Sequence, residues 1–256
     1  MNKIKNKSIW VLSVNIILSL ALFIINIFYQ LNAPAWNLTF KFIGSGIFVL
    51  LGIINFIFAI KTPNLNFNFA LTTLIGLVLS FAGDVAIEYE FIAGAALFAL
   101  AHICYIVGFY FIKKFHWLDI LITAIFAIPA TLLIGLLPVF NFNPPVLQYV
   151  VIIYAVIISF MFGKALSNLI RERNFHTIIV FIGAILFVLS DFALLIELFH
   201  VDGSYHWGHA CMAIYFPALL IFAYSIYYQS KNSLNIKNSW VLQRFWKKEH
   251  FSVFFL

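Results

Sequence analysis

Two aspartates stand inside long apolar segments of this sequence, where a charge is costly. Asp84 falls within the apolar run 68–87, and Asp191 falls within the run 177–199. A carboxylate at the centre of a bilayer costs about 2.5 kcal/mol or more, so we expect both to face the interior of a helix bundle and to have polar partners. Two buried carboxyl groups can divide acid–base work, because burial and mutual repulsion keep one protonated while the other stays ionised. The alternative is a structural role, in which each aspartate only forms hydrogen bonds between helices.

Helix geometry places further polar side chains near the same depth. At about 1.5 Å per residue, Asp84 lies about 24 Å and Asp191 about 21 Å along its apolar run. Counted to the same side of the membrane, Tyr215 lies at about 20 Å and His102 at about 15 Å. We therefore expect these four residues to line one cavity. Tyr105 is one helical turn from His102, and the two are expected to orient the acids or a water molecule.

The elements that must hold these residues are membrane-spanning helices. Hydrophobic residues make up 64% of the 256 residues, charged residues only 9%, and the mean hydropathy is +1.04. A spanning helix needs roughly 20 apolar residues, whereas a spanning strand needs a shorter, alternating segment. The apolar runs lie near 9–29, 40–60, 68–87, 91–112, 118–138, 146–165, 177–199 and 209–228. The predicted fold class is therefore all-α, a polytopic membrane bundle with eight transmembrane helices.

The basic residues predict the orientation of the bundle. All of them except Lys41 lie in segments an even number of crossings apart: Lys3, Lys5, Lys7, Lys61, Lys113, Lys114, Lys164, Arg171, Arg173, Lys231, Lys237, Arg244, Lys247 and Lys248. Basic segments remain in the cytoplasm, so both termini are expected there, in a multi-pass protein of the inner (cytoplasmic) membrane. The first apolar run is longer than a signal-peptide core, which favours an uncleaved helix. The net charge of +6 thus reflects topology, and no nucleic-acid partner is expected.

The connections between the runs are short, so residues 1–230 are expected to form one eight-helix domain. Residues 231–256 form a basic, aromatic cytoplasmic tail, in which Trp240, Phe245 and Trp246 alternate with polar residues. This pattern suits a helix lying in the membrane interface, and a frayed tail is the alternative. Cys104 and Cys211 lie in apolar runs without the spacing of a metal site or a disulfide.

The remaining charges near the two aspartates have simpler interpretations. Glu88, Glu90 and Asp202 are expected to be solvated charges in external loops. Lys41, at the external start of the second run, either anchors that helix at the interface or contacts a lipid phosphate.

Several ordered motifs give the sequence a family resemblance. The most specific are Gly83-Asp84, His102 with Tyr105, and Ser190-Asp191. Further matching positions are Gly76, Gly94, Phe98, Tyr154, Met161, Ala165, Gly183, Ala184, Phe187, Tyr215 and Ala218. Over residues 39–225 the sequence resembles the YhhN family of membrane proteins, to which the lysoplasmalogenases belong. It departs from the family where Phe42, instead of Pro, follows Lys41, and where Leu219 replaces the Gln usual in bacterial relatives.

The resemblance implies an ether hydrolase that needs no metal or cofactor. Members of the family cleave the vinyl ether bond of lysoplasmalogens to a fatty aldehyde and a glycerophospho-base. Protonation of an alkenyl carbon gives an oxocarbenium ion that water captures, so an acid and a stabilising carboxylate are needed. Asp84 and Asp191 are the expected pair, and His102 is expected to assist them. Substrate contacts are expected from four further residues, of which the first binds the phosphate: Lys41, Tyr105, Ser190 and Tyr215. The expected partners are a lysophospholipid substrate and membrane lipids, and the sequence leaves the oligomeric state open.

Three other interpretations remain open. His200, His206 and His209 could join Asp191 in the zinc site of a membrane lipid hydrolase, because imidazole and carboxylate groups bind zinc. Intramembrane Asp and His residues also build proton-coupled transporters, although the runs lack matching Gly-Pro interruptions. The third possibility is a catalytically silent family member.

Overall fold

The computed structural model describes the backbone of residues 2–31, 34–62, 65–201 and 205–251. Side chains are described for residues 9–31, 38–62, 65–201 and 206–229. The predictions for Asp202 and for the side chains of Trp240, Phe245 and Trp246 lie outside these ranges. The interfacial placement of residues 231–256 therefore stays a prediction.

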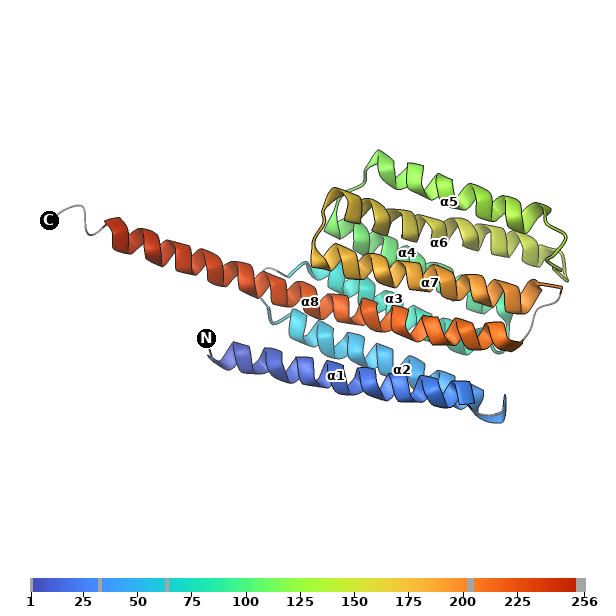
Figure 1. The fold of residues 1–256 in the computed structure, drawn as a ribbon, viewed down its shortest axis with the longest axis horizontal. Helices are drawn as coiled ribbons and strands as arrows, with labels where there is room; N and C mark the ends of the chain where they lie inside the picture. The colour runs from blue at the N-terminus through green and yellow to red at the C-terminus, as the bar shows by residue number, and fades with distance from the viewer. Residues whose placement is uncertain (1, 32–33, 63–64, 202–204, 252–256) are drawn as a thin grey trace.

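The described chain folds into eight long helices that run alongside one another (Figure 1). They are α1 (Asn2–Leu31), α2 (Pro34–Ala59), α3 (Phe67–Ala86), α4 (Phe91–Ile112), α5 (Trp117–Leu136), α6 (Val146–Arg171), α7 (Phe175–Phe199) and α8 (Tyr205–Phe251). Each contains a segment long and apolar enough to cross a bilayer. The predicted fold class, a polytopic helical membrane bundle, is confirmed.

The helices occupy distinct places in the bundle. In Figure 1, α1 and α2 lie at one edge and α5 at the opposite edge, while α3, α4, α7 and α8 lie between them. The last helix, α8, continues past the others toward the C-terminus. Residue contacts pair α3 with α4, α5 with α6, and α7 with α8, and α2 also packs on α8. The apolar exteriors of α1 and α5 are left for lipid.

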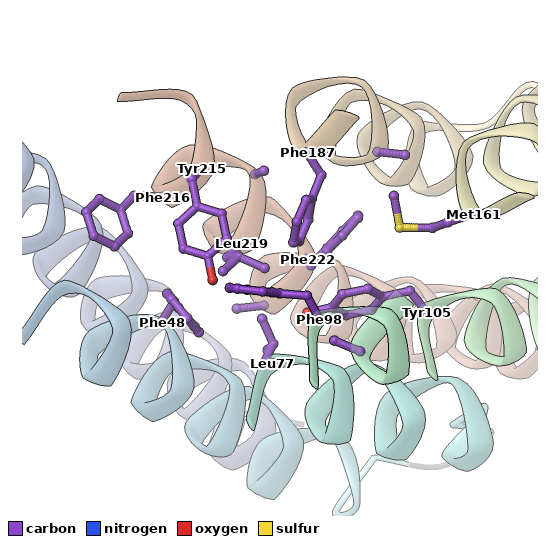
Figure 2. Packing of buried hydrophobic residues seen from close by; sticks show 14 of the residues in the cluster. Phe48, Leu77, Phe98, Tyr105, Met161, Phe187, Tyr215, Phe216, Leu219 and Phe222 are labelled. Carbon is purple, nitrogen blue, oxygen red and sulfur yellow. The ribbon is translucent and has the colours of Figure 1, made fainter. Parts of the chain in front are cut away.

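An aromatic core fills the centre of the bundle (Figure 2). The ring of Phe187 on α7 lies 4.6 Å from His102, 6.3 Å from Tyr105 and 5.5 Å from Tyr215, measured between ring centroids. Leu219, where the family usually has Gln, is fully buried in this apolar core. Small residues let the helices approach these rings, because a Cβ added at Gly76 would overlap the ring of Tyr105.

Polar side chains also tie the helices together. Asn15 on α1 and Asn55 on α2 exchange two side-chain hydrogen bonds, of 2.7 and 2.8 Å. Asn55 also donates to the carbonyl oxygen of Ala223 on α8, at 2.9 Å. One asparagine thereby joins three helices within the apolar part of the bundle, where an unpaired amide would be costly.

A buried ion pair connects α5 and α6. Lys164 Nζ lies 2.9 Å from Asp119 Oδ2, and both side chains are almost completely buried. The same carboxylate oxygen accepts a hydrogen bond from the backbone N–H of His116, at 2.9 Å, at the start of α5. Lys164, which the sequence assigns to the cytoplasmic side by its charge, thus lies inside α6 and neutralises a buried acid.

An exposed ion pair near the same end of the bundle offers a comparison. Lys113 Nζ lies 2.5 Å from Glu172 Oε2, and both side chains are partly exposed. The hydrogen bond from Lys113 holds the pKa of Glu172 below its ordinary value. The contribution of this pair to stability is therefore present at neutral pH and is lost as the pH falls through that lowered pKa.

The two pairs should respond differently to removal of one partner. Asp119→Leu leaves the Lys164 ammonium buried and unpaired, and we expect it to cost about 3–5 kcal/mol of stability. Adding Lys164→Met should recover most of that loss, because both charges are then gone. Lys113→Met, the control in the exposed pair, should cost about 1 kcal/mol or less. Thermal unfolding in detergent measures all three, and a double variant as unstable as Asp119→Leu would contradict the interpretation.

Candidate functional site

A polar cavity of about 390 Å³ opens between the helices where α3 and α7 end and α4 begins. Five of the predicted site residues line it, from four different helices: Lys41, Asp84, Ser190, Asp191 and Tyr215. Asp84 and Asp191 are far apart in the sequence, and the bundle brings them to the same cavity, as their predicted depths require. We call this space the polar cavity.

Hydroxyl groups from two other helices hold Asp84. Its Oδ2 accepts a hydrogen bond from Ser45 Oγ on α2, at 2.6 Å, and another from the Tyr215 hydroxyl on α8, at 2.9 Å. Asp84 is only 1% exposed. Since burial of a carboxyl group without partners is costly, these two donors explain how α3 tolerates the residue.

A tyrosine and a histidine hold Asp191. The Tyr154 hydroxyl on α6 donates to Asp191 Oδ2 at 2.5 Å, and His102 Nε2 on α4 lies 2.8 Å from that hydroxyl. His102 Nε2 also lies 3.4 Å from Asp191 Oδ2, while its buried Nδ1 has no hydrogen-bond partner among the described residues. A hydrogen on Nε2 suits this geometry, because the tyrosine oxygen can accept it while the tyrosine donates to the carboxylate. His102 thus stands behind Asp191 as part of its support.

The two carboxyl groups share one feature that matters for ligands. Each uses Oδ2 for its protein donors, and no described residue donates a hydrogen bond to Oδ1 of Asp84 or Asp191. One oxygen of each carboxyl group is therefore left for a water molecule or a ligand in the polar cavity. Two such oxygens on one cavity can give and accept protons at the same bound molecule.

Lys41 is paired inside the polar cavity. Its Nζ lies 2.6 Å from Glu88 Oε1, and both residues line the cavity. Glu88 lies in the turn after α3 and is exposed, as expected, and the structure adds its ion pair with Lys41. Glu90 is exposed, as expected, and its carboxylate caps α4 by accepting from the backbone N–H groups of Ile92 and Ala93.

Tyr105 lies apart from the cavity. Its hydroxyl is 3.2 Å from Ser80 Oγ, and its ring packs on Phe222 with 4.6 Å between centroids. The side chain is fully buried in the aromatic core. Of the predicted residues, Tyr105 and His102 are thus the two that do not line the polar cavity, and only His102 contacts one of the acids.

The structure adds residues that sequence reasoning missed. Ser45 donates a hydrogen bond to Asp84. Glu197 and Cys211 line the polar cavity, and the sulfur of Cys211 lies 3.3 Å from Ser190 Oγ. Ser45 lies four residues after Lys41, so the two share a helix face, and that spacing could have identified it. Glu197 lies seven residues after Ser190, which again places it on the face that carries the site.

The histidines of the zinc alternative have other neighbours. His209 Nδ1 lies 3.0 Å from Gln30 Oε1, and the ring of His200 packs edge-on against Phe140. Within the described part of the chain, no three His, Cys, Asp or Glu side chains gather closely enough to hold a metal ion. Among these residues, His200, His206 and His209 therefore do not form a zinc site with Asp191.

Fold and site together define a polytopic membrane protein with two supported carboxyl groups on one intramembrane cavity. The sequence profile of the YhhN family matches residues 36–226, a range that contains all of the predicted site residues. The chain belongs to the YhhN family, so the resemblance carried by its motifs is confirmed. A search of curated proteins and a search of solved structures found no match.

The hydrogen bonds from Ser45 and Tyr215 to Asp84 predict how substitutions of Asp84 affect stability. In Asp84→Asn the amide oxygen can still accept from Ser45 and Tyr215, so we expect a change within about 1 kcal/mol. Asp84→Leu leaves both buried hydroxyl groups without an acceptor, at about 1–3 kcal/mol each. Thermal unfolding in detergent should separate the two variants. Equal destabilisation by Asn and Leu would show that the hydrogen bonds to Asp84 do not hold it.

Proposed function

We propose that this protein is a membrane-embedded hydrolase that cleaves the vinyl ether bond of a lysoplasmalogen. The observation that carries the proposal is the pair of carboxyl groups, Asp84 and Asp191, on one polar cavity with an oxygen of each free for a ligand. Membership of the YhhN family is consistent with this reaction. The products would be a fatty aldehyde and a glycerophospho-base.

The chemistry needs one proton donor and one carboxylate. A protonated carboxyl group gives its proton to the alkenyl carbon farther from the ether oxygen, and the carbon bonded to that oxygen becomes an oxocarbenium ion. The ionised carboxylate stabilises this cation and accepts a proton from the water that adds to it. The resulting hemiacetal breaks its bond to the glycerol oxygen, which takes up a proton. One water is consumed for each aldehyde released.

The neighbouring residues have supporting roles in this proposal. Tyr154 and His102 hold the orientation of Asp191, whereas Ser45 and Tyr215 hold Asp84. Lys41 would contact the substrate phosphate, with Glu88 as its partner when the cavity is empty of lipid. Ser190, next to Asp191 on α7, lines the polar cavity and can contact the glycerol.

Aldehyde release from a lysoplasmalogen by the purified protein in detergent tests the proposal directly. We expect the parent to be active and Asp84→Asn and Asp191→Asn to lose at least about a hundredfold in turnover, because each removes one of the two proton-transfer groups. Tyr154→Phe should lose less, since the carboxyl group remains and only its support is removed. An alkyl ether lysophospholipid without the double bond should be inert.

The outcomes separate the competing interpretations. Loss of activity in both Asn variants that still unfold at the parental temperature supports the carboxyl pair. An inert parent would contradict the proposed reaction and favour transport or a silent family member. Full activity in either Asn variant would overturn its assignment as an acid or base.

We also propose that the protein lies in the cytoplasmic membrane with both termini in the cytoplasm, which places the polar cavity toward the external side. A membrane-impermeant maleimide added to intact cells should label Tyr89→Cys, at the cavity end, and spare Lys61→Cys, at the other end. Both positions are exposed, and Cys104 and Cys211 would first be replaced by Ala. Labelling at position 61 alone would reverse the orientation.

A further inference from the structure

Glu197 is a carboxylate of the polar cavity that the proposed reaction does not use. It lies on α7, six residues after Asp191, and its partly buried side chain lines the cavity. Among the side chains that the structure describes, none forms a hydrogen bond or an ion pair with its carboxyl group. A partly buried carboxylate without a partner is costly in an apolar bundle, so a positively charged group of a ligand would be stabilised beside it.

The charged groups that line the polar cavity are mostly acidic. Among its described lining residues Lys41 is the one basic side chain, whereas four carry carboxyl groups: Asp84, Glu88, Asp191 and Glu197. Lys41 neutralises Glu88, at 2.6 Å. The charge of Glu197 is not neutralised in this way, so the cavity favours a ligand that carries a positive group as well as a phosphate.

The position of Lys41 relates Glu197 to the acids of the proposed reaction. Lys41 is near enough to Asp84 and to Glu197 for its charge to act on both. In the proposed substrate the phosphate stands between the vinyl ether and the base. The cavity offers groups for all three parts, because the two aspartates suit the vinyl ether, Lys41 suits the phosphate and Glu197 suits the base.

The spacing along α7 fits the length of such a substrate. The rise of the helix from Asp191 to Glu197 is about 9 Å. In an extended glycerophosphoethanolamine, the ether oxygen and the amine nitrogen are roughly 10 Å apart by standard bond lengths. Since both side chains line the polar cavity, one molecule can place its vinyl ether near Asp191 and its ammonium group near Glu197.

Gly208, in the first turns of α8, makes room for the Glu197 side chain. A Cβ added at Gly208 would overlap the carboxyl group of Glu197. Any side chain at this position would therefore push that carboxyl group away. The close approach of the α8 backbone thus determines where Glu197 places its charge on the cavity wall.

We propose that Glu197 recognises the base of the substrate headgroup by binding its ammonium group. This proposal rests on the proposed function, which leaves the base without a binding residue, and it assigns one. An ethanolamine ammonium group can donate charge-assisted hydrogen bonds to the carboxylate. An anionic phosphoglycerol headgroup offers a phosphate to Lys41 but no cation to Glu197. Glu197 is therefore the residue that separates zwitterionic from anionic headgroups.

Acyl lysophospholipids test this headgroup site without the reaction, because they lack the vinyl ether. Equilibrium binding to the purified protein in detergent would compare lysophosphatidylethanolamine with lysophosphatidylglycerol of the same acyl chain. We expect the parent to prefer the ethanolamine lipid, and Glu197→Gln to weaken its binding about tenfold, because a hydrogen bond between charged groups is lost. The glycerol lipid should bind to this variant as well as to the parent, or better. Glu90→Gln, which removes an exposed carboxylate outside the cavity lining, should keep the parental preference.

Gly208→Ala tests the same site without changing any charge. Its methyl group displaces the Glu197 carboxyl group, so we expect this variant to lose the ethanolamine preference as Glu197→Gln does. Gly46→Ala is the matched control, because a Cβ added there meets no atom within 4 Å. Thermal unfolding of each variant reports a fold defect. A parental preference in Glu197→Gln, or an equal loss of binding for both lipids, would overturn the proposal.

Failure of the headgroup site and failure of the proposed reaction give different results. An ethanolamine preference that depends on Glu197, in a parent that is inert on lysoplasmalogen, would support the headgroup site and contradict the reaction. Aldehyde release from an ethanolamine lysoplasmalogen with the same KM in the parent and in Glu197→Gln would support the reaction and overturn the headgroup site.

Discussion

The cost of placing carboxyl groups among apolar helices constrains the rest of this structure. Asp84 and Asp191 each need hydrogen-bond donors, and within the apolar bundle those donors come from other helices. Ser45 on α2 and Tyr215 on α8 satisfy the first, while Tyr154 on α6 satisfies the second. Each acid therefore acts as a link between helices as well as a candidate reacting group.

The aromatic core joins the two acid sites mechanically. Phe187 packs against His102, which supports Asp191, and against Tyr215, which supports Asp84. A shift of either support would move this ring, and close-packed interiors do not absorb such shifts easily. The aromatic core therefore does more than bury apolar surface, because it also fixes the positions of the groups that hold Asp84 and Asp191. Leu219 is part of that apolar core and is not among the residues that line the polar cavity.

The number of helices and the depth of the two aspartates could be predicted from the sequence, whereas the side-chain contacts between helices could not. Apolar runs set the number of spans, and the rise per residue put Asp84 and Asp191 at one level. The ion pair of Lys164 could not be predicted, because charge counting uses position along the chain and does not detect its partner Asp119. Tyr105 shares a helix with His102, but three residues turn the helix by about 300°, leaving the two side chains about 60° apart. That difference directs one toward Asp191 and the other toward Ser80.

The two acids differ in exposure and in the groups that hold them. Asp84 is 1% exposed and is held by two hydroxyl groups, whereas the side chain of Asp191 is 13% exposed and is held by one, and both line the polar cavity. Ser45 and Tyr215 fix one carboxyl oxygen of Asp84, and Tyr154 fixes one of Asp191, so a substrate in the polar cavity would meet the other oxygen of each carboxyl group, on two different helices.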